Sequence, residues 1–168
     1  TNEVNPLPEG GNKPPHQQRI FKQRLPIVCF DNADGVEGDH DNIFGIWSKN
    51  IMEQADTAVG VLLPKRQKCD RWYATRGTVN HVGEMGQWDE YIAKEVGATT
   101  DSSNEFSSYH LKVHVSGTLW DVSHHGPRPG KYIHKYGDAV RTFGKDVCLR
   151  QLAQGKRPPD LIVRSHVH

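Results

Sequence analysis

Three short apolar runs divide this chain, and polar or titratable residues follow each run closely. The runs cover residues 25–30, 72–74 and 161–163. Short apolar runs of this kind are typical of strands that are buried on both faces. The segments between them have the spacing of helices and of one hairpin. Because strands alternate with helices along the chain, the sequence predicts an α/β fold with layered elements.

The segments between the runs predict three helices. Apolar residues recur at helical spacing from Ile43 to Leu62, and we expect that helix to stop near Pro64. A second helix is predicted around residues 88–96, with Gly97 as its terminator. A third helix is predicted over residues 139–152, although Gly144 weakens it. The four tryptophans of the chain are predicted to be core residues.

A hairpin is the remaining regular element. Residues 108–115 alternate between apolar and polar side chains, and Gly117 predicts a turn into a partner strand at 118–123. The polar side of the first strand carries His110, for which we expect a position on the surface. Residues 1–24 are interpreted as an extended loop rich in proline and glycine, and residues 25–168 as one domain.

The composition argues against several classes of partner. There are 21 basic and 20 acidic residues and the net charge is +1, so no overall field attracts nucleic acid or an anionic membrane. No apolar run approaches the roughly 20 residues that cross a bilayer, so no membrane partner is expected. The three cysteines are odd in number and far apart, which favours reduced thiols and a cytoplasmic protein.

The polar residues after the predicted strands form the candidate site. Asp34 follows the first apolar run, Asn80 and His81 follow the second, and His124 follows the hairpin. The last run is followed by a further pair of histidines, His166 and His168. In α/β folds, reactive groups lie at the carboxyl ends of strands. We therefore expect these side chains to meet at one edge, and the competing interpretation is that scattered polar residues cap strands.

The residue types suit a divalent metal centre. His166 and His168 are two residues apart, so a strand directs both imidazoles to the same side. Together with Asp34, Asn80 and His124 they would form a mixed nitrogen and oxygen shell for manganese, zinc, iron or nickel. Two such ions about 3.5 to 4 Å apart lower the pKa of a shared water and bind a phosphoryl oxygen. An imidazole outside that shell could protonate the leaving oxygen, and His81 is the candidate.

The motifs, in their order along the chain, resemble those of the calcineurin-like metallophosphoesterases, in particular a branch met in phage and prophage genomes. They are Ala33-Asp34, Asn80-His81, His124-His125-Gly126 and Ser165-His166-Val167-His168. The resemblance covers roughly residues 25–168. It implies a four-layer αββα sandwich with mixed sheets and a centre of two divalent metal ions. It also implies hydrolysis of a phosphoester, a nucleotide or nucleic acid among the candidates, by a metal-activated hydroxide.

The resemblance also implies a role for each site residue. Asp34 is similar to the carboxylate that bridges the two ions. Three residues are similar to ligands of one ion, and His168 to a ligand of the other. These three are Asn80, His124 and His166. His81 is similar to the histidine that contacts the phosphate and assists the leaving group.

Two further residues are candidates for substrate binding. The resemblance places His125 outside the metal shell, beside its ligand His124. Arg76 precedes the Asn80-His81 motif and has the charge to meet a phosphate, but an arginine at a strand end that pairs with carboxylates is an equally good interpretation. We expect His125 and Arg76 to contact the substrate.

The sequence departs from the family pattern at several positions. Ala33, Val79 and Ser165 stand where the family has glycine, and no Asp-x-His motif precedes Asp34. That motif supplies ligands to the second ion in the family, so we expect an incomplete second site and a fragment truncated at both ends. The alternative function is a catalytically inactive truncated relative that binds at most one metal ion. The sequence assigns no oligomeric state.

Overall fold

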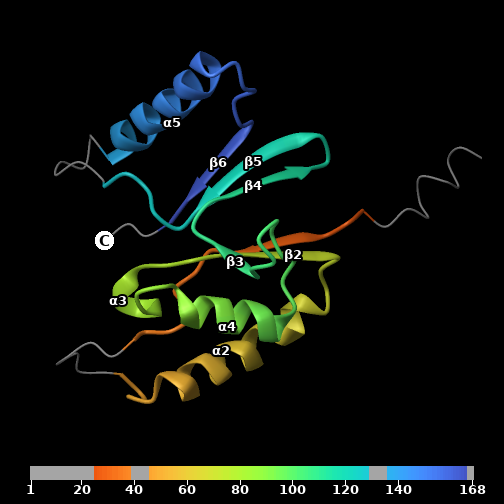
Figure 1. Cartoon of the computed structure of the whole chain (residues 1–168), viewed down its shortest axis with the longest axis vertical. Helices are drawn as coiled ribbons and strands as arrows, with labels where there is room; N and C mark the ends of the chain where they lie inside the picture. Colours follow the sequence, from red (N-terminus) through yellow and green to blue (C-terminus); the bar gives the residue numbers. More distant parts are fainter. Residues whose placement is uncertain (1–24, 39–45, 129–135, 166–168) are drawn as a thin grey trace, which may run out of the picture.

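The computed structural model describes residues 25–38, 46–128 and 136–165. Within these ranges the protein has a mixed α/β fold with two three-stranded sheets. Figure 1 shows the sheets side by side, with α2 (Ile51–Arg66) and α4 (Gln87–Val96) near one and α5 (Tyr136–Ala153) near the other. Within these ranges, every helix is too short or too polar to span a bilayer.

The first sheet is parallel throughout. Its order is β1 (Val28–Asp31), β2 (Arg71–Thr75) and β3 (Ser107–Ser108). Helix α2 connects β1 to β2, and α4 lies between β2 and β3 along the chain. Parallel neighbouring strands need a crossover connection, and these helices lie in the crossovers. Because β1 and β2 run in the same direction, their carboxyl ends lie at the same edge of the sheet.

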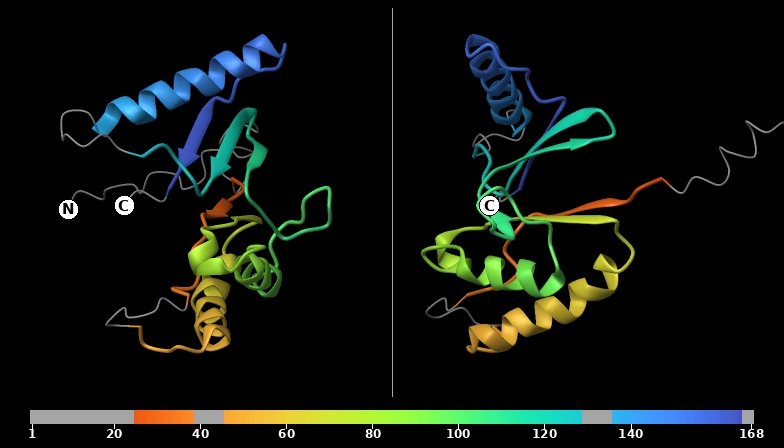
Figure 2. Two further views of the ribbon diagram at one scale, coloured as in Figure 1. Left: turned by 60° about the vertical axis from the view of Figure 1, so that its left-hand side comes forward. Right: turned by 45° about the vertical axis from the view of Figure 1, so that its right-hand side comes forward.

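The second sheet combines a hairpin with a parallel strand. Strand β4 (Leu111–Val115) pairs antiparallel with β5 (Thr118–Ser123), and β6 (Leu161–Arg164) pairs parallel with β5. Both views of Figure 2 show α5 next to this sheet. The carboxyl ends of β5 and β6 therefore lie together, as those of β1 and β2 do.

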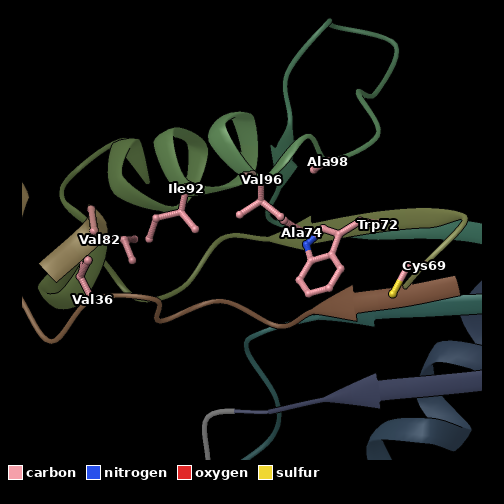
Figure 3. Packing of buried hydrophobic residues seen from close by; sticks show 10 residues of the cluster. Val36, Cys69, Trp72, Ala74, Val82, Ile92, Val96 and Ala98 are labelled. Carbon is pink, nitrogen blue, oxygen red and sulfur yellow. The ribbon is translucent and has the colours of Figure 1, made fainter. Parts of the chain in front are cut away.

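Alternate residues of the first sheet face opposite layers, as the period of two requires. Trp72 and Ala74 are buried in the apolar cluster that includes Ile92 and Val96 of α4 (Figure 3). On the other side, the Phe30 ring stacks on Tyr73 of the neighbouring strand at 5.5 Å between centroids. Phe30 also stacks on Trp120 of β5 at 5.3 Å, and this contact joins the two sheets.

The predicted helices are present with one correction. Helix α2 begins at Ile51, where the Asn50 side chain accepts a hydrogen bond from the Met52 amide at 3.1 Å. Residues 46–50 are not helical, and residues 43–45 lie outside the described ranges. The helix ends at Arg66, near Pro64 as predicted; the proline lies in the last turn, and the Gln67 amide still bonds to the Leu63 carbonyl.

The other elements follow the sequence closely. Helix α4 ends at Gly97, which has a left-handed φ of 76°, and α5 continues through Gly144. The hairpin of β4 and β5 is confirmed, although the predicted strand from residue 108 is divided between β3 and β4. Residues 79–82, which follow the second predicted strand, form the short helix α3 (Val79–Val82).

Two details of the core contradict the sequence predictions. Cys29 and Cys69 form a disulfide, so the prediction of three reduced thiols is wrong for this pair. The pairing of β1 with β2 places Cys29 opposite Trp72, and the turn before β2 brings Cys69 beside it. Trp47 is 61% exposed rather than part of the core, because it precedes the helix that was expected to bury it.

Candidate metal centre

The ends of strands from both sheets meet at Asp34 and His124. Asp34 follows β1, and His124 follows β5 directly. The His124 Nε2 atom lies 2.8 Å from the Asp34 Oδ2 atom. His124 is 3% exposed and the Asp34 side chain is 23% exposed, so this contact is partly sheltered from water. The fold therefore brings together two of the predicted metal ligands from distant parts of the sequence.

An unusual backbone holds the Asp34 carboxylate. Ala33 and Asp34 both have left-handed φ values, 67° and 57°. The Thr78 amide donates a hydrogen bond to Asp34 Oδ1 at 3.2 Å. A Cβ atom at Gly77 would lie 1.9 Å from the same oxygen, which no side chain permits. Gly77 is thus required by the close approach of the carboxylate to the backbone after β2.

Asp89 of α4 connects the loops that follow β1 and β2. Its Oδ2 atom accepts a hydrogen bond from the Gly77 amide at 2.7 Å, and its Oδ1 atom accepts one from the Gly35 amide at 3.3 Å. The side chain is buried, with 5% exposure. From the sequence, Asp89 is only an acidic residue in the first turn of a helix. No spacing signal could have revealed its role, because its partners are backbone amides far away in the sequence.

A set of hydrogen bonds fixes the orientation of His124. Its Nδ1 atom lies 2.7 Å from the carbonyl oxygen of Asn32. The Asn32 side-chain amide donates to Ser165 Oγ at 2.5 Å, and the Ser165 amide donates to the His124 carbonyl at 3.1 Å. The ends of β1, β5 and β6 are therefore tied together around the imidazole.

This orientation determines what His124 offers to Asp34. A carbonyl oxygen only accepts hydrogen bonds, so Nδ1 carries the proton and Nε2 of a neutral ring carries a lone pair. That lone pair faces a carboxylate oxygen at 2.8 Å, and two acceptors at this distance require a proton or a cation. Adjacent ligands with bonds of about 2.1 Å to one metal lie about 3 Å apart. The pair fits a shared divalent ion.

Buried carboxyl groups make this region acidic. Burial and, to a smaller extent, the charge of Asp89 raise the pKa of Asp31 to about 6, against the opposing effect of Lys65. The pKa of Asp89 is also raised, chiefly by burial and in part by the charge of Asp34, although the amides of Gly77 and Gly35 lower it. A cation bound here would relieve the repulsion between these groups.

His81 and Asp34 line the same cavity, which has a volume of about 660 Å³. The His81 Nδ1 atom lies 2.7 Å from the Glu37 carbonyl oxygen, so in the neutral ring Nε2 is the nitrogen that can take up a proton. The remaining predicted ligands are not placed by the structure. Asn80 lies in α3, but its side chain is outside the described part, as are His166 and His168.

The described residues alone do not complete a metal shell. Among them, no group of three or more histidine, cysteine, aspartate or glutamate side chains has an arrangement that could hold a metal ion. The predicted shell needs the amide of Asn80 and the imidazoles of His166 and His168 in addition to the Asp34 and His124 pair.

Arg76 is engaged by carboxylates. Its guanidinium forms ion pairs with Glu90 at 3.2 Å and Glu105 at 3.1 Å, and its Nε atom donates to Ser107 Oγ. It also lies 5.4 Å from the centroid of the Tyr109 ring. These contacts match the alternative interpretation in which the arginine pairs at a strand end. Its binding of a substrate phosphate stays a prediction.

His125 and His110 lie along a second hollow, between β5 and α5. The His125 ring is 5.4 Å from the His124 ring in an edge contact, and His125 lines this hollow with Arg164. His110 is half-exposed, as expected of a surface residue, but its Nε2 atom lies 2.8 Å from the buried Asp121 carboxylate. The exposed His125 residue therefore lies beside the candidate centre.

No family model, curated protein or solved structure matches this chain. The functional interpretation therefore depends on the motifs of the chain and on the geometry around Asp34 and His124.

Proposed function

We propose that this domain is a calcineurin-like phosphoesterase that hydrolyses phosphate esters with two divalent metal ions. The observation that carries the proposal is the approach of His124 Nε2 to Asp34 Oδ2 at 2.8 Å, with Nδ1 already committed to the Asn32 carbonyl. A histidine and an aspartate in this relation are a suitable pair of ligands for manganese, zinc, iron or nickel.

The arrangement of the layers supports the same family. Helices α2 and α4 border one sheet, α5 borders the other, and Phe30 and Trp120 stack between the sheets. We infer that the domain is a four-layer αββα sandwich. In such a fold the ends of β1, β2, β5 and β6 supply the site, as Asp34 and His124 do here.

The residues divide the work as follows. Asp34 and His124 would hold the first ion with Asn80 and His166, and His168 would hold the second together with Asp34. Bound ions would supply positive charge that lowers the pKa of a water and stabilises the phosphoryl oxygens. The Asn32 carbonyl orients His124, and hydrogen bonds to Asp89 connect the loops after β1 and β2.

His81 would transfer a proton to the leaving group. The Glu37 carbonyl holds its Nδ1–H, so Nε2 exchanges a proton with the leaving oxygen of the ester. Loss of such a group typically lowers the rate by about 100-fold to 10,000-fold without abolishing metal binding. His81 should therefore separate catalysis from metal affinity.

The test combines calorimetric titration with manganese and hydrolysis of nitrophenyl phosphate. Asp34→Asn and His124→Ala should each weaken manganese binding by about 10-fold to 100-fold and abolish turnover. His81→Ala should leave binding unchanged and lower turnover by at least about 100-fold. The matched controls, Asp138→Asn and His114→Ala, change exposed residues and should alter neither quantity.

The stoichiometry separates the proposal from the inactive relative. Two ions per chain with turnover support the phosphoesterase. One ion without turnover supports the inactive relative. Turnover that survives both Asp34→Asn and His81→Ala contradicts the mechanism.

A further inference from the structure

The cavity that Asp34 and His81 share extends well beyond the candidate metal centre. It has a volume of about 660 Å³ and lies between α2 and the segment after β1. A phosphoryl group and its ions fill only the part near Asp34. The remaining volume is sufficient for the organic part of a substrate, since small-molecule sites are typically about 300 to 1,000 Å³.

One wall of this cavity is apolar. Ala58, Val61 and Leu62 line it from α2, at the spacing that places them on one face of the helix. Trp47 lines it from the segment before α2. Val61 is 56% exposed and Trp47 is 61% exposed, so these apolar surfaces are accessible to a ligand.

The polar side of the cavity is acidic. Asp31, Asp34 and Glu37 line it, and no lysine or arginine occurs among the described lining residues. Ions held by Asp34 would offset the charge at one end. Asp31 and Glu37 would still face the remainder of the cavity, so that part favours a neutral or positive group and repels an anion.

Hydrogen bonds of Gln54 connect the segments around the cavity. The buried Gln54 side chain accepts a hydrogen bond from the Glu37 amide at 2.8 Å and donates one to the Ser48 carbonyl at 2.7 Å. These bonds attach both neighbouring segments to α2. A preformed cavity loses little entropy when a ligand binds.

We propose that this cavity binds the alcohol portion of the substrate, and that the substrates are phosphate esters of apolar alcohols that are uncharged or positively charged. The assignment of the phosphate rests on the proposed function, but binding of the alcohol portion does not require a metal. A nucleic-acid strand, which carries a negative charge on every residue, is unsuited to this cavity.

The first experiment measures binding to the metal-free full chain by calorimetry. Three probes share one ring system and differ in charge: naphthylmethylamine, naphthylmethanol and naphthoate. The amine should bind most tightly, the alcohol next, and naphthoate at least about tenfold more weakly than the amine. Equal affinity for all three, or tightest binding of naphthoate, would overturn the proposal.

Variants locate the binding site. Val61→Lys places a positive charge on the cavity wall and should weaken amine binding by about tenfold. Met52→Lys places the same charge on an exposed position of α2 outside the lining and should leave it unchanged. Glu37→Gln should reduce the preference for amine over alcohol. Circular dichroism checks that each variant folds, and identical binding by the two lysine variants contradicts this location.

Hydrolysis of naphthyl phosphate with manganese distinguishes the two proposals. Probe binding in the expected order without hydrolysis contradicts only the proposed function. Hydrolysis in the presence of manganese without the expected order of probe binding contradicts only the substrate class.

Discussion

The two sheets of this protein are stabilised in different ways. The first sheet, with α2 and α4, contains the large apolar cluster, whose buried members all lie between Val36 and Ala98. Among the described residues of the second sheet and α5, one hydrophobic side chain, that of Val122, is buried. Its neighbours Asp121 and His124 are buried polar residues. The first region is therefore held mainly by burial of apolar surface, and the second depends on polar contacts.

The polar contacts of the second region centre on Asp121. Its carboxylate, 1% exposed, pairs with the guanidinium of Arg164 and with His110. Arg164 also donates to the Asp121 carbonyl at 2.8 Å and lies 5.2 Å from the Phe143 ring centroid of α5. A buried ion pair is weak evidence for net stability, because the attraction between the charges must offset the free energy of removing them from water. Because Asp34 follows a strand of the first sheet and His124 follows a strand of the second, the candidate centre depends on both regions.

The largest expected effect comes from Asp121→Ala. The variant leaves the largely buried Arg164 without its carboxylate, which lowers the free energy of unfolding by about 3 to 5 kcal/mol. Urea unfolding should measure this decrease in the free energy of unfolding. Amide hydrogen exchange should increase most in β4, β5, β6 and α5. The control Asp138→Ala removes an exposed carboxylate of α5 and should change stability by less than about 0.5 kcal/mol. Equal losses in the two variants would contradict the comparison.

The disulfide tests the first region in the same way. Cys29 and Cys69 are 40 residues apart, and a crosslink of this length contributes about 2 to 4 kcal/mol, in one account by constraining the unfolded chain. Replacement of both cysteines by serine should lower the unfolding free energy by this amount. Exchange should increase in β1, β2 and α2. Cys148→Ser, which removes a free thiol, serves as the control. Faster exchange confined to the second sheet in the double variant would refute the prediction that the disulfide stabilises the first region.

A smaller effect depends on pH. The pKa of Asp31 is about 6 in the folded protein and 3.8 in its ordinary state, so the folded state binds the proton more tightly. Its contribution to stability is complete below about pH 4 and is lost as the pH rises to about 6. Asp31→Asn should remove this decline and leave the metal-free protein about 1 to 3 kcal/mol more stable above pH 6. Urea unfolding from pH 4 to 7.5 measures it.

An exposed carboxyl group of α5 provides the control for this pH dependence. Asp138→Asn removes that group and should retain the wild-type pH profile. Parallel profiles for wild type and Asp31→Asn would show that the Asp31 carboxyl is not perturbed.

The sequence by itself determined the elements whose signals are local. The apolar face of α4 and its terminator Gly97, the alternation in β4 and the short apolar run of β6 are all recognisable in the order of the residues. These patterns reflect the periods of helices and strands, which neighbouring residues encode. The choice of Asp34 and His124 as partners also follows from sequence motifs, and the fold places them 2.8 Å apart.

Only the tertiary structure decided how those residues are held. The Asn32 carbonyl orients His124, Asp89 joins the amides of Gly35 and Gly77, and Cys29 meets Cys69. Backbone amides and carbonyls have no residue-type signature, so no pattern in the chain announces these contacts. They arise because parallel strands bring distant turns to one edge, which is a property of the assembled sheets rather than of any single segment.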